Sequence, residues 1–233
     1  MTNLYCDGDS WSVSNNGVGN VMGWYLSNLM GYNMENYGHP GKSIDKVIRS
    51  VQRHVLSNSE SNNDTAYMIG IGHTQRFDIS TGEEVQMKYP FLSMRSEMGV
   101  ESVRIEALIN TDRVFAEQFI KWFEYPFLEY QTLSKLVSLH DFLRYHKVDF
   151  IIHNLGFDYD YDLEYEFGKQ WLDEVEKRPR IVNFFKDSFH SIMQKENFVP
   201  FNYDLYQWNG HQEGPGHKYY AEYLHEKWQS IHD

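Results

Sequence analysis

The apolar positions of the first 72 residues follow two spacings, one typical of buried strands and one typical of amphipathic helices. Residues 4–6 are apolar and lead into Gly8-Asp9-Ser10, and residues 65–72 form a nearly continuous apolar run, as strands buried on both faces do. Tyr32 to Tyr37 is predicted to be a further strand. Apolar residues recur at helical spacing along two segments, at Met22, Leu26 and Leu29 before Gly31, and at Ile44, Val47, Ile48, Val51 and Val55. The order strand, helix, strand, helix, strand predicts a parallel sheet with right-handed crossovers.

The rest of the chain continues this pattern after an interruption. From His73 to about Asn110 no clear periodicity is present, and a stretch of that length directly after a strand is predicted to be an insertion that acts as a lid or binding loop. Residues 112–145 are predicted to be helical and divided at Pro126, and Val148–His153 to be the fourth strand. A helix is expected over 180–195. A closing helix is indicated by the shared face of Tyr220, Leu224, Trp228 and Ile231.

The segment 157–176 is acidic and rich in tyrosine, and it is predicted to lie on the surface. A calcium loop is an alternative, because carboxylates alternate at Asp158, Asp160, Asp162 and Glu164. This spacing lacks the central glycine and the terminal glutamate of an EF-hand loop. No metal site and no cofactor are therefore predicted.

Composition restricts the classes of partner. The 233 residues are enough for one domain with an insertion, predicted here to span residues 1–233, and 41% are hydrophobic, as in globular proteins. A net charge of -12 argues against a nucleic acid or an anionic membrane surface as the main partner. No apolar run approaches the roughly 20 residues of a membrane span. The start of the chain lacks a signal-peptide pattern, and the single cysteine, Cys6, allows no internal disulfide, so synthesis in the cytoplasm is expected, with a later place on a virion left open.

The candidate chemistry begins at Ser10, at the carboxyl end of the first strand. Open α/β sheets bind their ligands beyond the strand ends, and a helix N-terminus that follows can stabilise negative charge. The plain alternative is a turn with a helix-capping serine. A serine nucleophile needs a base, and His211, in a loop just before the last helix, is favoured over His217, whose helical spacing to apolar residues indicates packing.

Four segments in this order resemble the four sequence blocks of the SGNH (GDSL) hydrolase superfamily. They are Gly8-Asp9-Ser10, the glycine loop 38–43, the glycine motif 70–76, and residues 209–217, which hold two histidines six positions apart. The form of residues 70–76, with the long insertion after it, is similar to members encoded by tailed bacteriophages. The resemblance implies a three-layer α/β/α sandwich with a flavodoxin-like parallel sheet, the SGNH-hydrolase fold, with the insertion after its third strand.

The resemblance also implies a hydrolase of carboxylic esters, including acetyl groups on carbohydrates. By motif, Ser10 would be the nucleophile and His211 the base. Gly41, with Gly38 as the alternative, and Gly72 would belong to the oxyanion hole and substrate site. In such enzymes the hole is formed by backbone N–H groups and an asparagine side chain.

Two positions depart from the family pattern. The expected Gly-x-Asn-Asp is replaced by Gly72-His73-Thr74, so that His73 or Thr74 would have to donate to the oxyanion. Trp208 stands where an acid should precede His211, and the adjacent Asn209 could orient the imidazole through its amide oxygen. Asp204 and Glu213 are alternatives that the spacing does not separate.

These departures keep other functions open. One is a catalytically weakened module that binds glycans or serves as a structural part of a larger, phage-like particle, with virion or homo-oligomer partners. The aromatic content of 16% suits both glycan stacking and protein interfaces. A third possible function is nucleotide or phosphate binding, because the loop 38–43 precedes a helix. The residue spacing of this loop, however, matches neither a P-loop nor a dinucleotide-binding motif.

Overall fold

The computed structural model describes most of an alternating α/β chain. It covers residues 1–8, 21–39, 42–58, 62–72, 76–80, 100–104, 114, 117, 125–156, 158, 166–198 and 215–232. In chain order the elements are β1 (Asn3–Asp7), α1 (Met22–Met30), β2 (Asn33–Asn36), α2 (Ile44–Ser57), the short 3-10 helix η2 (Asn62–Asp64), β3 (Thr65–Ile71), β4 (Arg76–Ser80), β5 (Val100–Arg104), α7 (Tyr125–Tyr145), β6 (Asp149–Asn154), α8 (Glu166–Glu176), β7 (Ile181–Val182), α9 (Phe189–Lys195) and α10 (Pro215–His232).

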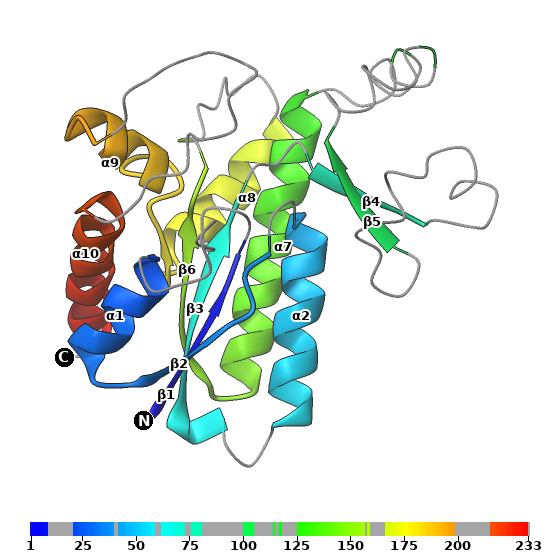
Figure 1. Cartoon of the computed structure of the whole chain (residues 1–233). Coiled ribbons are helices and arrows are strands. Elements are labelled where there is room, and N and C mark those ends of the chain that lie inside the picture. Colours follow the sequence, from blue (N-terminus) through cyan, green and yellow to red (C-terminus); the bar gives the residue numbers. More distant parts are fainter. Residues whose placement is uncertain are drawn as a thin grey trace.

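The main sheet has five strands in the order β2-β1-β3-β6-β7, and every neighbouring pair is parallel. Numbered along the chain, these strands follow the flavodoxin-like order 2-1-3-4-5. All of their carboxyl ends therefore point to the same edge, which lies at the top of Figure 1. The predicted parallel sheet is confirmed.

Helices cover both faces of this sheet. In Figure 1, α2, α7 and α8 lie on one side of the strands and α1, α9 and α10 on the other. The side chains of β3 alternate accordingly, because Tyr67 and Ile69 belong to the core cluster of the first face and Ala66 and Met68 to that of the second. The predicted three-layer α/β/α sandwich is therefore confirmed.

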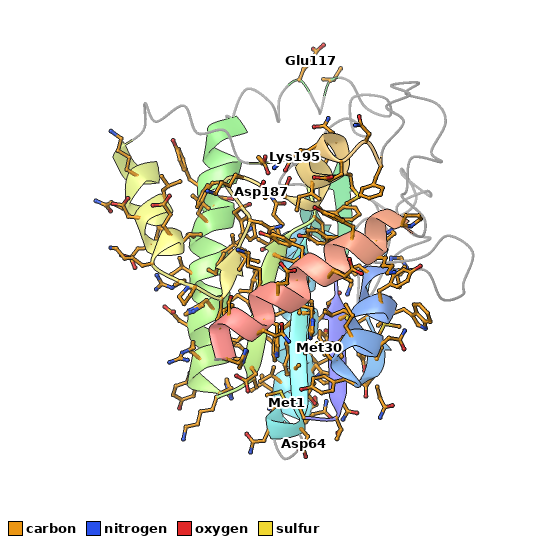
Figure 2. All side chains as sticks on the ribbon, turned by 90° about the vertical axis from the view of Figure 1, so that its left-hand side faces the viewer. Met1, Met30, Asp64, Glu117, Asp187 and Lys195 are labelled. Atoms are coloured by element: carbon orange, nitrogen blue, oxygen red, sulfur yellow. The ribbon has the colours of Figure 1, made fainter. Side chains whose placement is uncertain are left out.

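The face under α1 and α10 is closely packed. Figure 2 looks onto it and shows α10 crossing the strands, with Met1 and Asp64 at one end of the sheet and Lys195 at the other. A Cβ atom at Gly23 would lie 2.9 Å from the Sγ of Cys6, so glycine lets α1 approach β1. Cys6 is buried, and burial raises the pKa of its thiol to about 12, which confirms it as a small buried hydrophobe.

Local signals fix the end of α1 and the start of α2. Helix α1 stops at Gly31, whose φ of 69° is in the left-handed region that favours glycine. Helix α2 begins after Ser43, whose hydroxyl accepts a hydrogen bond from the backbone N–H of Lys46 at 3.1 Å. The loop between β2 and α2 is thus ended by a capped helix, as its sequence predicts.

The expected helix over 180–195 is wrong in its first half. Residues 181–182 form β7, the fifth strand, and helix α9 begins only at Phe189. The backbone of Asn183 and Asp187 has positive φ, 56° and 58°, which a helix cannot accommodate. The surface segment 157–176 also contains a helix, α8, that the sequence pattern did not indicate.

The insertion contains regular structure, contrary to its irregular pattern. Strands β4 and β5 pair antiparallel as a separate two-stranded sheet, with Arg76 opposite Arg104. Strand β4 contacts α2 and lies outside the main sandwich in Figure 1. Helix α7 begins at Tyr125, so Pro126 lies in its first turn, where its missing N–H costs no helical hydrogen bond. Of residues 112–124, only 114 and 117 are described.

Candidate active site

The predicted site residues fall mainly outside the described part of the chain. Gly72 is described and directly follows β3, half-buried. The others lie outside the described residues: Ser10, Gly41, His73, Thr74, Asn209 and His211. The geometry of the site is therefore given by the residues that flank them.

The end of β1 is joined to the loop that follows β2. The carbonyl of Gly8 accepts a hydrogen bond from the backbone N–H of His39 at 3.1 Å, and the carbonyl of Cys6 accepts one from Tyr37 at 2.8 Å. Gly38, the alternative oxyanion glycine, donates its N–H to the side chain of Asn36 at 2.9 Å. The segments that lead to Ser10 and to Gly41 therefore begin side by side.

The end of β3 is joined in the same way to the end of β6. The N–H of Leu155 donates to the carbonyl of Ile71 at 2.7 Å. A Cβ atom at Gly156 would lie 3.5 Å from the carbonyl oxygen of Gly72, so the two glycines bring their backbones close together. Gly72 thus lies at the sheet edge that also holds Gly8, because β1 and β3 are neighbouring parallel strands.

A buried ion pair lies below the turn after β1. The Nζ of Lys42 is 2.6 Å from Oδ1 of Asp7, and the two side chains are 5% and 0% exposed. Lys42 also donates to the carbonyl of Tyr37 at 2.8 Å and lies 3.4 Å from the hydroxyl of Ser50. Asp7 accepts from the N–H of Gly8 at 2.7 Å. We call Asp7, Lys42, Tyr5 and Ser50 the charged cluster.

Tyr5 completes the charged cluster from the middle of β1. Its hydroxyl donates to Oδ2 of Asp7 at 2.8 Å and lies 3.2 Å from that of Ser50. Burial raises the pKa of Asp7, and the ammonium of Lys42 is the main influence in the opposite direction. Burial and the negative charge of Asp7 raise the pKa of Tyr5, so its hydroxyl stays protonated and remains a donor.

Sequence reasoning missed this cluster. Lys42 lies in the loop considered for phosphate binding, but its ammonium is buried against Asp7, which disfavours that function. The available signal was an acidic residue at the end of an apolar strand, since Asp7 follows Leu4-Tyr5-Cys6. Buried carboxylates are rare unless they are paired, so a buried Asp7 predicts a positively charged partner from another part of the chain.

A second buried polar group, which we call the neutral cluster, lies at the end of β6. Its centre is the hydroxyl of Tyr220, which donates to the carbonyl of Asn154 at 3.1 Å and accepts from Nδ2 of Asn183 at 2.5 Å. Nδ1 of His153 lies 3.2 Å from the same hydroxyl. Among the described residues, Nε2 of His153 has no hydrogen-bond partner. Burial lowers the pKa of His153 to about 3, so the ring is neutral.

His217 has the packing role predicted for it. It lies in the first turn of α10, is 3% exposed, and stacks on Phe189 with ring centroids 5.3 Å apart.

Asp158, the first carboxylate of the alternative calcium loop, accepts hydrogen bonds from the N–H of Ser188 and the hydroxyl of Ser191 at the start of α9. The other three carboxylates of that loop lie outside the described residues.

Among the described residues, no three His, Cys, Asp or Glu side chains come together as a metal ion would require. No helix in the same part of the chain has both the length and the apolar character needed to cross a bilayer.

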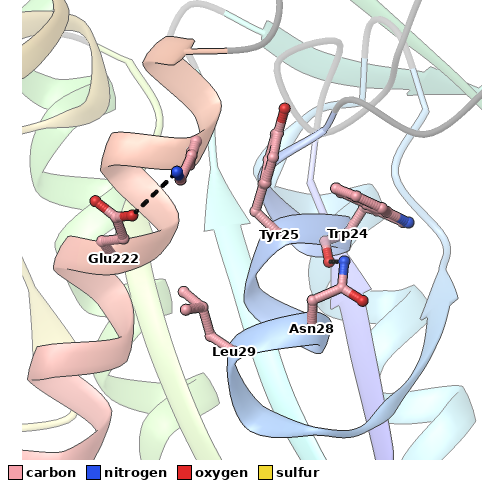
Figure 3. A pocket seen from close by; sticks show the side chains of 6 residues that line it. Trp24, Tyr25, Asn28, Leu29 and Glu222 are labelled. Atoms are coloured by element: carbon pink, nitrogen blue, oxygen red, sulfur yellow. Dashed lines mark hydrogen bonds and ion pairs between the residues drawn. The ribbon is translucent and has the colours of Figure 1, made fainter.

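A surface pocket of about 360 Å³ lies between α1 and α10. These are the helices that follow the segments holding Ser10 and His211. Figure 3 shows Leu29 pointing toward α10 and the ion pair of Lys218 and Glu222 on the opposite wall, where the two charged groups are 3.9 Å apart. Trp24, which is 41% exposed, Tyr25 and Asn28 complete the lining. An exposed indole beside polar groups is typical of surfaces that bind sugars or proteins.

Known proteins resemble the chain only distantly. No family model matches it, and no curated protein is similar enough to count as a relative. Over 97% of this chain and 99% of the other, the fold is similar to that of a candidate lipolytic protein of the G-D-S-L family from Desulfitobacterium hafniense, with 12% identity and a TM-score of 0.43.

Two further solved structures are similar at the same level. A candidate SGNH hydrolase from Slackia heliotrinireducens has 9% identity and a TM-score of 0.42, over 97% of this chain and 98% of the other. A candidate GDSL-like lipase from Parabacteroides merdae has 13% identity and a TM-score of 0.43, over 98% and 95%. Since these TM-scores are low, the function of this chain has to be inferred from its own residues.

Proposed function

We propose that this protein is a serine esterase or deacylase that hydrolyses a carboxylic ester, with acetyl groups on carbohydrates as one substrate class. The observation that supports the proposal most is the junction of β1 with the loop after β2, where the Gly8 carbonyl accepts from the His39 N–H at 3.1 Å. Ser10 follows one side of this junction and Gly41 the other. A nucleophile and an oxyanion donor must approach one carbonyl group together, so their segments have to be neighbours.

The proposed mechanism has two steps. The hydroxyl of Ser10 attacks the ester carbonyl carbon while His211 takes its proton, and His211 then returns the proton to the leaving alcohol. Water, activated by the same histidine, cleaves the acyl-serine and releases the acid. Backbone N–H groups of Ser10 and Gly41 would bind the oxyanion, with His73 or Thr74 after Gly72 as the third donor.

The two departures from the family pattern bear on the rate. Removing one donor from an oxyanion hole costs about 10²–10³ in kcat, so a weakly placed His73 or Thr74 would slow the enzyme by up to this factor. Asn209 can orient the ring of His211 but cannot stabilise the imidazolium as a carboxylate does. A slow esterase is therefore expected.

A fluorophosphonate probe tests the proposal. It should label the native chain on Ser10, and Ser10→Ala should abolish labelling, while Ser12→Ala, a change two residues away, should leave it intact. Hydrolysis of p-nitrophenyl acetate should be lost in the same variant. Equal labelling of the native chain and Ser10→Ala would refute the proposal.

The pocket between α1 and α10 favours a second function, that of a glycan-binding or structural module of a larger particle such as a virion. Trp24 is an exposed aromatic residue on α1, and the pocket that it lines also holds the amide of Asn28 and the Lys218–Glu222 pair, a combination suited to sugars. Binding on a glycan array should fall on Trp24→Ala and persist on Tyr145→Ala, a matched loss of an exposed aromatic residue on α7. Glycan binding without probe labelling would select this function over the esterase.

A further inference from the structure

The Asp7–Lys42 ion pair connects the two segments on which the proposed chemistry depends. Asp7 is the last residue of β1, three positions before Ser10, and Lys42 directly follows Gly41. The 2.6 Å contact between them spans 35 positions of sequence. The pair is thus a side-chain connection between the nucleophile turn and the oxyanion loop.

Burying an ion pair is an expensive way to stabilise a fold. The desolvation of two charges offsets much of their attraction, and apolar side chains of similar volume often serve stability equally well. Charges in such a position therefore suggest a geometric role, because directional hydrogen bonds fix distances that apolar contacts leave adjustable.

The hydrogen bonds of the pair end on the backbone of both segments. Asp7 holds the N–H of Gly8, and Lys42 holds the carbonyl of Tyr37. Beside them, the carbonyl of Gly8 accepts from the N–H of His39. Each segment is consequently held at a backbone atom and through a charged side chain.

We propose that Asp7 and Lys42 are positioning residues that set the distance between the turn of Ser10 and the loop of Gly41. The role in catalysis rests on the proposed esterase function, whereas the mechanical connection does not. Neither side chain takes part in a bond-making step. Asp7, the Tyr37 carbonyl and Ser50 all lie within hydrogen-bond distance of the Lys42 ammonium, so its charge is directed at both segments.

The expected effect is on kcat. Oxyanion donors act at about 2.7–3.1 Å, and a shift of about 1 Å between reacting groups costs about 10²-fold in rate. A looser connection would weaken stabilisation of the transition state more than binding of the ground state. This gives the pair a kinetic signature that a purely structural ion pair lacks.

The test uses the double variant Asp7→Asn/Lys42→Met, which keeps the side-chain shapes and removes both charges. With p-nitrophenyl acetate, kcat should fall by about tenfold or more and KM should stay within about twofold. The matched control is Asp45→Asn/Lys135→Met, because this ion pair also ties α2 to a neighbouring element, α7, at 2.8 Å, and neither side chain belongs to the charged cluster. The control should keep both constants within about twofold of the native values. An unchanged kcat in a folded Asp7→Asn/Lys42→Met chain would overturn the proposal.

Amide hydrogen exchange separates failure of this inference from failure of the proposed function. The N–H groups of Gly8 and His39 should exchange at least about tenfold faster in Asp7→Asn/Lys42→Met than in the control, whether or not the chain is an esterase. Absent turnover and labelling in the native chain would refute the esterase alone. Unchanged exchange at both amides would refute the connection itself.

Discussion

The charged cluster and the neutral cluster solve the same structural problem with different chemistry. Each lies at the carboxyl end of a core strand, and each joins that strand to a later segment of the chain. Asp7 and Lys42 do so with two ionised groups on the α2 side of the sheet, whereas Tyr220 joins Asn154 to Asn183 with neutral groups on the α10 side. The charged cluster should therefore lose stability when one of its two charges is removed. The neutral cluster, which includes a buried histidine, should lose stability in acid.

The largest expected effect is the loss of one charge. Lys42→Met leaves the fully buried Asp7 carboxylate without its counter-ion and should lower the free energy of unfolding by about 3–5 kcal/mol. Asp7→Asn/Lys42→Met should recover most of this loss, because no buried charge remains. Urea denaturation of the native chain and both variants measures the two quantities. Equal stability of the single and double variants would show that the pair is not electrostatically coupled.

The next effect compares one hydroxyl in each cluster. Tyr5→Phe removes a donor to a carboxylate and should cost about 2 kcal/mol, since hydrogen bonds to charged groups contribute about 1.5–3 kcal/mol. In the Asp7→Asn/Lys42→Met background the cost should fall to about 1 kcal/mol, the value of a neutral bond.

Tyr220→Phe provides the control for this cycle. Its hydroxyl contacts Asn154, Asn183 and His153 on the α10 side of the sheet, whereas the charged cluster lies on the α2 side, so the cost should be the same in both backgrounds. A Tyr5→Phe cost that is also independent of background would mean that the charge of Asp7 adds nothing to its bond with Tyr5.

Acid should weaken the neutral cluster. The pKa of His153 is lowered from 6.5 to about 3 in the folded chain, so its contribution to stability is complete above pH 6.5 and is lost as the pH falls toward 3. At pH 5.5 the expected loss is about 1.4 kcal/mol. Urea denaturation at pH 7 and pH 5.5 should show a smaller decrease for His153→Phe than for the native chain.

This comparison isolates one histidine from several. Burial also lowers the pKa values of His54, His140 and His190, so the native chain loses stability in acid for more than one reason. Only the difference between the native chain and His153→Phe belongs to the neutral cluster. Equal decreases in the two proteins would contradict a neutral, buried ring.

Local patterns were sufficient to predict most of the fold. The burial of β3 can be predicted from its continuous apolar run, and the buried face of α2 from its apolar stripe. Strand β7 could not be found in this way, because it has two residues and exists through its pairing with β6, whose Ile152 N–H donates to the carbonyl of Arg180. Such pairing depends on contacts distant in sequence.

The site was predictable to a smaller extent. Motif order identified Ser10, Gly41 and His211, which lie outside the described residues and stay predictions. The packing of His217 was predicted from its helical spacing to apolar residues, and the ring does stack on Phe189. Nothing in the sequence pairs Asp7 with Lys42, because the partnership arises only when β1, β2 and the start of α2 are packed together. Motifs identify residues that react, and the structure adds those that hold them in place.

The smallest effect concerns the helix caps beside the two clusters. Ser43 caps α2 next to Lys42, and Ser43→Ala should cost about 1 kcal/mol. Ser188 caps α9 in the same way, but Asp158 also accepts from its backbone N–H at 2.8 Å, and that bond survives Ser188→Ala. The negative charge of the Asp158 carboxylate also interacts favourably with the positive end of the helix dipole of α9. The expected cost of Ser188→Ala is therefore about 0.5 kcal/mol. Removing the Asp158 carboxylate as well, by Asp158→Ala, should bring the Ser188→Ala cost up to that of Ser43→Ala in urea denaturation. If Ser188→Ala already costs as much as Ser43→Ala with Asp158 in place, the carboxylate does not support the cap.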